Sequence, residues 1–163
     1  MKVVAFLPAK GSSSRIESKN MKLLDGKPLF LHTLQKLVDS NLFDEVYLDT
    51  ESDDVISAAS EVDCRILRRD KALADNKTDG NKMFLNEVNH VDSDIYVQIL
   101  CTSPFIKIET IKEGIDQLKS SDKYDSAVLV RKERLYTWTD HAPNYDINAI
   151  PNSVDIGDTV IET

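Results

Sequence analysis

The sequence contains few cysteines and no long apolar run. Its 163 residues include two cysteines, Cys64 and Cys101, too few for a disulfide framework and without metal-ligand spacing. This content favours a reducing, cytoplasmic setting. No stretch approaches the roughly 18 to 20 apolar residues of a membrane helix, and the apolar N-terminus soon reaches charge and glycine. We therefore expect no signal peptide, no membrane span and no membrane partner.

Positive charge is also scarce. Lys and Arg number 20 against 28 Asp and Glu, so the formal net charge is −8. This acidity argues against sequence-independent binding of nucleic acid, although a local basic patch can still hold a small anion. Hydrophobic residues make up 41% and charged residues 29% of the chain, as in an ordinary globular protein. The length predicts one domain over residues 1–163.

Patterns typical of strands alternate with patterns typical of helices. Short apolar runs predict strands at 3–7, 45–49, 64–67, 94–101 and 126–130. Apolar residues at helical spacing predict helices from residue 28 onward, over 53–60, over 83–91 and over 109–119. The alternation predicts an α/β fold, a mainly parallel sheet with helices on both faces. The strand-like run at 158–163 has no stop signal, so we expect the domain to lack its C-terminal elements.

The polar segment 8–28 follows the first expected strand, where parallel sheets commonly bind ligands. It combines Gly11 and three serines with several cations, among them Lys10, Arg15, Lys19 and Lys22. Glycine and serine let backbone N–H groups approach an anion, and the cations can neutralise several negative charges. The composition leaves open a solvated basic loop or a polyphosphate site, and the position favours the second. Neither a dinucleotide fingerprint nor a Walker P-loop is present.

Four short motifs stand in order along the chain. Residues 6–29 read FLPAKGSSSRIESKNMKLLDGKPL, 48–55 read LDTESDDV, 69–74 read RDKALA and 100–105 read LCTSPF. They resemble, in the same order, I-P-A-R-G-G-S-K-x-I-x-x-K-N-x-x-x-x-x-G-K-P-L, V-S-T-D-S-E-E-I, R-P-x-x-L-A and Q-P-T-S-P-L. These are patterns of the CMP-sugar synthetases, the cytidylyltransferases that act on acylneuraminate and related acids.

The resemblance implies a Rossmann-like nucleotidyltransferase fold of the GT-A type. It also implies that an acceptor oxygen attacks the α-phosphate of CTP and that pyrophosphate is released, with Mg²⁺ as cofactor and a homodimer as the assembly. The expected acceptor is an acidic small molecule: a nonulosonic acid, a 3-deoxy-octulosonate or a phosphonate. Two alternatives stay open. One is a non-catalytic nucleotide-binding domain or inactive fragment, and the other is a same-fold enzyme that uses another nucleoside triphosphate.

Matching positions give expected roles for single residues. Lys10 takes the place of the family's triphosphate-binding arginine, and the backbone of Gly11, Ser12 and Ser13 is expected to cradle phosphate. Lys19 matches a phosphate-contacting lysine, Asn20 a nucleotide-binding asparagine and Arg69 an arginine near the cytidine, and Arg15 of the same loop joins this nucleotide-binding set. Lys10 and Lys19 are the predicted catalytic residues, because phosphoryl transfer depends on orientation and charge neutralisation.

The sequence departs from the family patterns at three places. Lys10 keeps the charge of arginine but loses its bidentate geometry, and Leu100 and Cys101 replace Gln-Pro, which removes a polar contact. The family's magnesium-binding aspartates lie toward its C-terminus, in a part that this chain does not match. The resemblance therefore assigns no metal ligands to this chain.

Two further clusters have alternative interpretations. Asp49, Glu51, Asp53 and Asp54 could hold Mg²⁺, or could stand there because a helix N-terminus favours acidic residues, and we prefer the second interpretation. The cations and aromatic residues over 131–141 fit either an acidic-acceptor pocket or a dimer contact.

Overall fold

The computed structural model describes residues 1–13, 16–75 and 78–162, so the predicted site residue Arg15 lies outside the described residues. The chain divides into two compact units, Met1–Asp116 and Gln117–Thr163. That both units form one domain over 1–163 stays a prediction.

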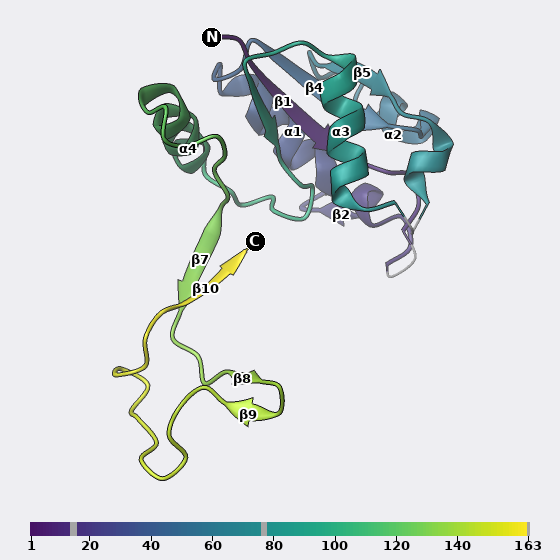
Figure 1. Ribbon diagram of the computed structural model, residues 1–163. Helices are drawn as coiled ribbons and strands as arrows, with labels where there is room; N and C mark the ends of the chain where they lie inside the picture. The colour runs from purple at the N-terminus through teal and green to yellow at the C-terminus, as the bar shows by residue number, and fades with distance from the viewer. Residues whose placement is uncertain (14–15, 76–77, 163) are drawn as a thin grey trace. The chain divides into compact units, whose positions relative to one another are not determined.

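The first unit is built on a four-stranded parallel sheet (Figure 1). Its strands are β1 (Val3–Pro8), β4 (Glu45–Thr50), β5 (Arg65–Arg68) and β6 (Ile95–Gln98), in the order β5-β4-β1-β6. All three pairings are parallel, which confirms the predicted sheet. The chain steps outward from β1 to β4 and β5 and then crosses to β6 on the other side of β1. The point between β1 and β6 is therefore a topological switch point, where open α/β sheets bind ligands.

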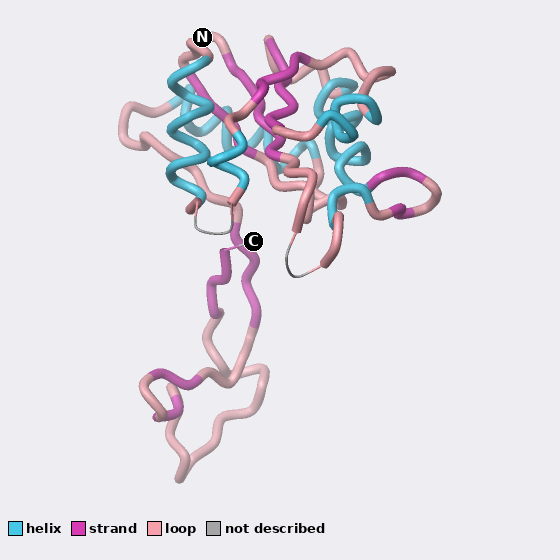
Figure 2. Tube along the Cα trace, turned by 90° about the vertical axis from the view of Figure 1, so that its right-hand side faces the viewer, coloured by secondary structure: helices cyan, strands magenta, loops and turns pink. Residues whose placement is uncertain are grey.

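Four α-helices connect or follow these strands: α1 (Leu29–Asp39), α2 (Asp53–Ala58), α3 (Gly80–His90) and α4 (Ile108–Ser120). In Figure 1, α3 lies in front of the sheet and α1 behind it, and Figure 2 shows helices on both sides of the strands of the first unit. The predicted helices are confirmed, with α1 starting directly after Pro28. No helix in the described parts of the chain combines the length and apolar character needed to span a membrane.

The core of the first unit surrounds β1, in which every residue is buried. Phe6 packs against Tyr47 and Tyr96 of the neighbouring strands, with ring centroids 5.5 and 6.3 Å away. Helix α1 buries Phe30, Leu34 and Leu37, which the 3.6-residue period places on one stripe. This packing fixes the carboxyl end of β1, from which the basic loop starts.

The segments predicted as loops contain short elements of their own. The 3-10 helix η1 (Lys19–Met21) and the small hairpin of β2 (Leu23–Leu24) and β3 (Lys27–Pro28) lie between β1 and α1. A second 3-10 helix, η2 (Lys71–Ala74), follows β5. Ser52 is the N-cap of helix α2, and its hydroxyl accepts a hydrogen bond from Val55 N.

The second unit contains the end of α4 and two small antiparallel pairs, β7 (Val130–Glu133) with β10 (Thr159–Glu162) and β8 (Trp138–Thr139) with β9 (Ala142–Pro143). No residue between 117 and 162 is buried. Its strand pairs expose large apolar side chains, including Val130, Trp138 and Val160.

Two predicted strand boundaries are wrong. The strand expected at 126–130 starts only at Val130, the residue from which β7 pairs with β10. The strand expected at 94–101 ends at Gln98. Ile99 N still donates a hydrogen bond of 2.9 Å to the Phe6 backbone oxygen, and the chain then turns at residues 101–102.

Candidate functional site

A cavity of about 570 Å³ opens at the carboxyl ends of β1 and β6. Two predicted cations, Lys10 and Lys19, line it together with apolar side chains such as Leu73, Met83 and Leu100. The other predicted residues that line it are Ser13, Asn20 and Arg69. The cavity therefore offers cations for phosphate groups and apolar surface for a flat base or sugar.

The two remaining described residues of the predicted set line a different hollow. Gly11 and Ser12 border a space of about 430 Å³ that is otherwise formed by Lys71 and by Glu51, Ser52, Asp53 and Asp54. Four residues of its lining belong to the acidic segment after β4. The structure thus separates the loop into a basic side at Lys10, Ser13 and Lys19 and an acidic side at Gly11 and Ser12.

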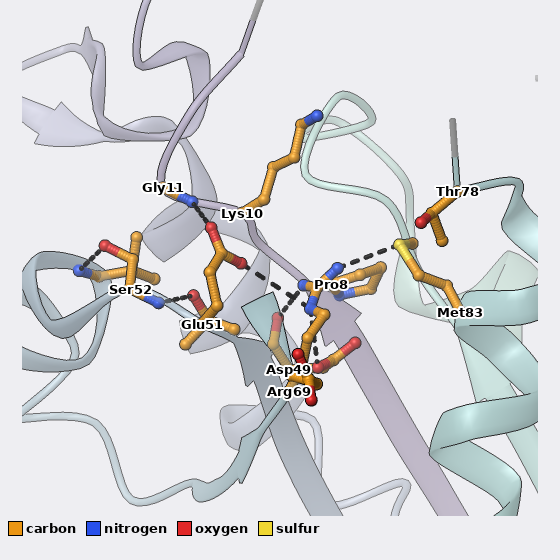
Figure 3. A network of polar contacts seen from close by, with 12 residues as sticks. Pro8, Lys10, Gly11, Asp49, Glu51, Ser52, Arg69, Thr78 and Met83 are labelled. Carbon is orange, nitrogen blue, oxygen red and sulfur yellow. Dashed lines mark hydrogen bonds and ion pairs between the residues drawn. The ribbon is translucent and has the colours of Figure 1, made fainter. Parts of the chain in front are cut away.

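Glu51 holds the loop at Gly11 (Figure 3). The backbone N–H of Gly11 donates a hydrogen bond of 2.8 Å to Glu51 Oε1. A Cβ atom at position 11 would lie 2.6 Å from both Cβ and Oγ of Ser52. Glycine is therefore required at this position by the close approach of the segment after β4. In this state the Gly11 N–H is directed to a protein carboxylate.

Asn20 is buried and shapes the same loop from the other end. Its Nδ2 donates a hydrogen bond of 2.9 Å to the backbone oxygen of Lys10. The contact joins η1 to the start of the loop and fixes the backbone from which the Lys10 side chain extends. A direct contact of Asn20 with nucleotide stays a prediction.

Arg69 lies just beyond β5 with its side chain only 1% exposed. Its Nη2 donates a hydrogen bond of 2.6 Å to the backbone oxygen of Asp49, and Nε lies 3.1 Å from Asp49 Oδ1. Nη1 contacts Met83 Sδ at 3.0 Å, and Nε lies 3.9 Å from Glu51 Oε2 (Figure 3). The guanidinium thus ties β4, the acidic segment and α3 together at the wall of the cavity.

Two carboxyl groups near Arg69 are fully buried, Asp49 on β4 and Glu87 on α3. Burial and a side-chain hydrogen bond with Asp49 raise the pKa of Glu87 to about 8. Burial also raises the pKa of Asp49, which Arg69 opposes. Sequence reasoning named Asp49 only as a member of the acidic cluster after the second expected strand, and it missed Glu87. Glu87 stands one turn from Met83 and Phe84 and one turn from Val91 on the apolar stripe of α3, and this placement was the available signal.

Cys101 closes the cavity near the end of β6. Its thiol is buried and donates a hydrogen bond of 3.3 Å to the Pro8 backbone oxygen. Burial raises the pKa of this thiol to about 12, so it stays protonated at neutral pH and is a poor nucleophile. Cys101 therefore contributes packing at this end of the cavity rather than nucleophilic chemistry.

The loop after β6 is held by a cation that the sequence did not single out. The ammonium of Lys36 on α1 donates hydrogen bonds of 2.7 and 2.8 Å to the backbone oxygens of Pro104 and Ile106. Both carbonyls belong to or follow the LCTSPF motif. Lys36 therefore positions the segment that contributes Leu100, Cys101 and Thr102 to the cavity.

The acidic cluster after β4 divides by role. Asp53 and Asp54 occupy the first turn of α2, the position expected from the helix dipole. A hydrogen bond from Arg68 lowers the pKa of Asp53. The part of the chain that the structure describes contains no group of three or more His, Cys, Asp or Glu residues that could hold a metal ion.

The cations of 131–141 have neighbours within the second unit. Arg131 Nε lies 3.1 Å from Glu133 Oε1, and Arg134 Nε lies 3.7 Å from Asp158 Oδ1. Tyr136 donates a hydrogen bond of 2.7 Å to the Pro151 backbone oxygen. Since both arginines have acidic neighbours, the local surplus of positive charge is small, which weakens the acceptor-pocket interpretation.

Similar solved structures place this fold among nucleotidyltransferases. A CMP-2-keto-3-deoxy-manno-octonic acid synthetase complexed with CTP aligns over 81% of this chain and 53% of its own, with a TM-score of 0.72 and 20% identity. This likeness confirms the predicted α/β nucleotidyltransferase fold.

Sequence comparison identifies the family. The family model described as cytidylyltransferase matches residues 4–147. A pseudaminic acid cytidylyltransferase of Campylobacter jejuni is 28% identical over 72% of this chain and 53% of its own length. A CMP-N,N'-diacetyllegionaminic acid synthase of Legionella pneumophila is 30% identical over 76% of this chain and 56% of its own. The chain spans about half the length of these relatives, and its matched region makes it a member of the cytidylyltransferase family.

Proposed function

We propose that the protein transfers CMP from CTP to an acidic sugar acceptor and releases pyrophosphate. The observation that carries the proposal is the cavity at the β1 and β6 strand ends, lined by Lys10, Ser13, Lys19 and Asn20. The names of the relatives, which refer to pseudaminic and legionaminic acids, favour a nonulosonic acid as acceptor. A 3-deoxy-octulosonate and a phosphonate are the other acceptors to test.

At the α-phosphorus the proposed reaction forms one bond and breaks one, and the acceptor hydroxyl loses its proton. An acceptor oxygen bonds to the α-phosphorus of CTP, the bond from that phosphorus to the β-bridging oxygen breaks, and the acceptor proton passes to solvent. Lys10 and Lys19 neutralise charge that moves onto the departing pyrophosphate, the kind of electrostatic stabilisation that dominates phosphoryl transfer. Asn20 supports Lys10 through its backbone oxygen. Leu73 and Leu100 add apolar surface to the lining of the cavity.

Mg²⁺ is proposed as the cofactor of the reaction. The described residues offer no cluster of metal ligands, so no reaction step is assigned to the ion. Mg²⁺ is commonly bound through substrate phosphates with few protein carboxylates, which makes the triphosphate of CTP the expected carrier. A cytoplasmic location also remains a proposal, supported by the two free thiols, Cys64 and Cys101.

We also propose a homodimer assembled through the second unit. Its large apolar side chains face solvent, with Trp138 61% and Val154 67% exposed. Large apolar side chains left exposed on one unit support a proposed interaction site. A second copy of the chain is the proposed occupant, because both Arg131 and Arg134 already have acidic neighbours and leave little charge for an anionic acceptor.

Pyrophosphate release is the test of the proposed activity. The full chain is incubated with CTP, Mg²⁺ and a panel of nonulosonic acids, a 3-deoxy-octulosonate and phosphonates. Acceptor-dependent release of pyrophosphate from CTP is expected. CTP binding without release from any acceptor would instead support the non-catalytic alternative.

Thermal shifts separate CTP from other nucleotides. A ligand that binds only the native state raises its stability by mass action. CTP with Mg²⁺ should therefore raise the melting temperature more than ATP, GTP or UTP. Equal shifts from all four nucleotides would contradict cytosine selectivity.

A further inference from the structure

A buried carboxyl pair lies next to the one buried cation found among the described residues. Asp49 and Glu87 are each 0% exposed, and Arg69 is 4% exposed. The three side chains come from β4, α3 and the segment after β5. Asp49 stands where the V-S-T-D-S-E-E-I pattern has serine, so the pair is a feature of this chain rather than of the motif.

Some buried carboxyl oxygens of this cluster lack a hydrogen-bond donor unless one carboxyl group is protonated. Glu87 Oε2 accepts a hydrogen bond of 2.6 Å from Gln98 Nε2. Within the described part of the chain, Glu87 Oε1 and both carboxyl oxygens of Asp49 have no hydrogen-bond donor. The contact of Arg69 Nε with Asp49 Oδ1 at 3.1 Å is an ion pair without hydrogen-bond geometry. Two ionised carboxylates in contact would repel each other, whereas one proton between them supplies the missing donor.

The neighbours of each carboxyl group decide which one holds the proton. Arg69 Nε lies 3.1 Å from Asp49 Oδ1, and this positive charge favours the ionised form of Asp49. Arg69 Nη2 donates to the backbone oxygen of Asp49 and holds the guanidinium in place. Glu87 receives only the neutral amide of Gln98. Burial, followed by the hydrogen bond with Asp49, raises the pKa of Glu87 to about 8. Glu87 is therefore the neutral acid at pH 7 and Asp49 the carboxylate.

We propose that Glu87 is a positioning residue that donates its carboxyl proton to Asp49 and thereby keeps Arg69 fixed at the wall of the nucleotide cavity. The proposal rests on the proposed function, because its consequence is a pH limit on CTP binding. Loss of the proton places a second negative charge beside Asp49 and draws the guanidinium toward Glu87. Arg69 also lies 3.9 Å from Glu51, which holds Gly11, so its displacement disturbs the phosphate loop.

Three other ionisable groups act on the pKa of Asp49 or Glu87. They are Arg69 beyond β5, Glu51 at the end of β4 and His90 on α3, which acts on Asp49 through its charge. The ordinary pKa of glutamate, 4.5, applies to the unfolded chain. Because the folded pKa is higher, the native state binds the extra proton between pH 4.5 and about 8. The stabilisation from Glu87 is complete below this window and is lost as the pH rises through it. The equilibrium constant for folding falls by up to about tenfold per pH unit.

Carbon NMR of the full chain tests the proton directly. The carboxyl carbon of Glu87 is followed from pH 4 to pH 9.5 and assigned with Glu87→Gln. A midpoint above pH 7 is expected. In Asp49→Asn the midpoint should fall, because the like charge is removed while Arg69 remains. A wild-type midpoint near the ordinary value, or no change in Asp49→Asn, would overturn the proposal. This measurement needs no nucleotide, so it is independent of the proposed activity.

The pH dependence of stability and of CTP binding tests the positioning role. Glu87→Gln keeps a donor toward Asp49 and cannot ionise, so its melting temperature should lose the extra decline that the wild type shows between pH 5 and 8.5. Its dissociation constant for CTP should stay flat to pH 9, where that of the wild type rises about tenfold per pH unit above the Glu87 pKa. The exposed control Glu61→Gln should follow the wild type. Parallel profiles of Glu87→Gln and wild type would refute the proposal, whereas absence of CTP binding at every pH would refute the proposed function alone.

Discussion

The two units of the chain differ most in what they bury. Every fully buried side chain of the described residues lies in Met1–Asp116, around the parallel sheet and α1. In Gln117–Thr163 the described residues form short antiparallel pairs, and none is buried. A packed unit can hold charged side chains in fixed positions, as it does for Arg69, Asp49 and Glu87. An unpacked unit needs a partner surface before its apolar side chains contribute stability.

This difference assigns the proposed functions to separate regions. The first unit contains the cavity, the basic loop and the cluster that holds Arg69. The second contributes exposed apolar surface and arginines that already contact acidic residues. Substitutions in the first unit should therefore affect folding and nucleotide chemistry, and those in the second should affect association.

The largest expected effect is on the core of the first unit. Phe6 is fully buried between Tyr47 and Tyr96. Phe6→Ala should lower the free energy of unfolding by about 3–5 kcal/mol, because it removes apolar burial and leaves a cavity. Urea titration measures the change. A loss below about 1 kcal/mol is typical of a surface substitution. Such a result would contradict a packed core in the first unit.

Catalysis should be the next most sensitive property. Lys19 lines the cavity, and Lys19→Ala should lower kcat by about 10²- to 10³-fold, the usual cost of losing a transition-state charge contact. Steady-state pyrophosphate assays provide the measurement, and circular dichroism checks the fold. Lys22→Ala, an exposed lysine of the same loop, is the matched control and should keep its kcat. Equal losses in both variants would indicate a general charge effect.

Substitutions in the second unit should weaken the association of two copies of the chain. Trp138, the one tryptophan of the sequence, is 61% exposed. Trp138→Ala should weaken dimerisation by about 2 kcal/mol, or about 30-fold in dissociation constant, as for an aromatic interface residue. Sedimentation velocity measures the change. Leu85→Ala removes a similarly exposed apolar residue of α3 and should leave association unaltered. A wild-type chain that stays monomeric at high concentration would contradict the dimer.

The smallest effect in this series concerns the phosphate loop. Gly11→Ala places a Cβ 2.6 Å from Ser52, so the loop must move, and the KM for CTP should rise by about tenfold because phosphate-binding groups are misplaced. Gly80→Ala is the control, since nothing lies within 4 Å of its Cβ position. An unchanged KM in Gly11→Ala would show that this contact is unimportant for nucleotide binding.

Most of the first unit could be predicted from sequence, because its elements have clear hydrophobic periods. The run Val3–Leu7 predicted β1, and the spacing of Phe30, Leu34 and Leu37 predicted α1. The apolar run at 126–129 led to a wrong strand prediction for the same reason. Its apolar residues are typical of a buried strand, yet they precede β7 and remain exposed. Burial depends on contacts between distant segments, which periodicity does not contain.

The charged part of the site was only partly predictable. Lys10, Lys19 and Asn20 were found from the loop and its resemblance, and the structure brings them to one cavity. The contact of Glu51 with Gly11 joins residues 40 positions apart. Pairing of Arg69 with buried Asp49 likewise depends on the neighbouring positions of β4 and β5. No local pattern specifies such long-range charge contacts.

Backbone amide NMR with CTP and Mg²⁺ tests the site of nucleotide binding most directly. The basic side of the loop and the β6 end should respond, so the amides of Ser13, Lys19 and Thr102 should show the largest shifts as CTP is added. Amides of Asp53 and of the second unit should change little. Shifts centred on the acidic hollow or on residues 117–162, or equal shifts with ATP, would contradict a cytidylyltransferase site at the ends of β1 and β6.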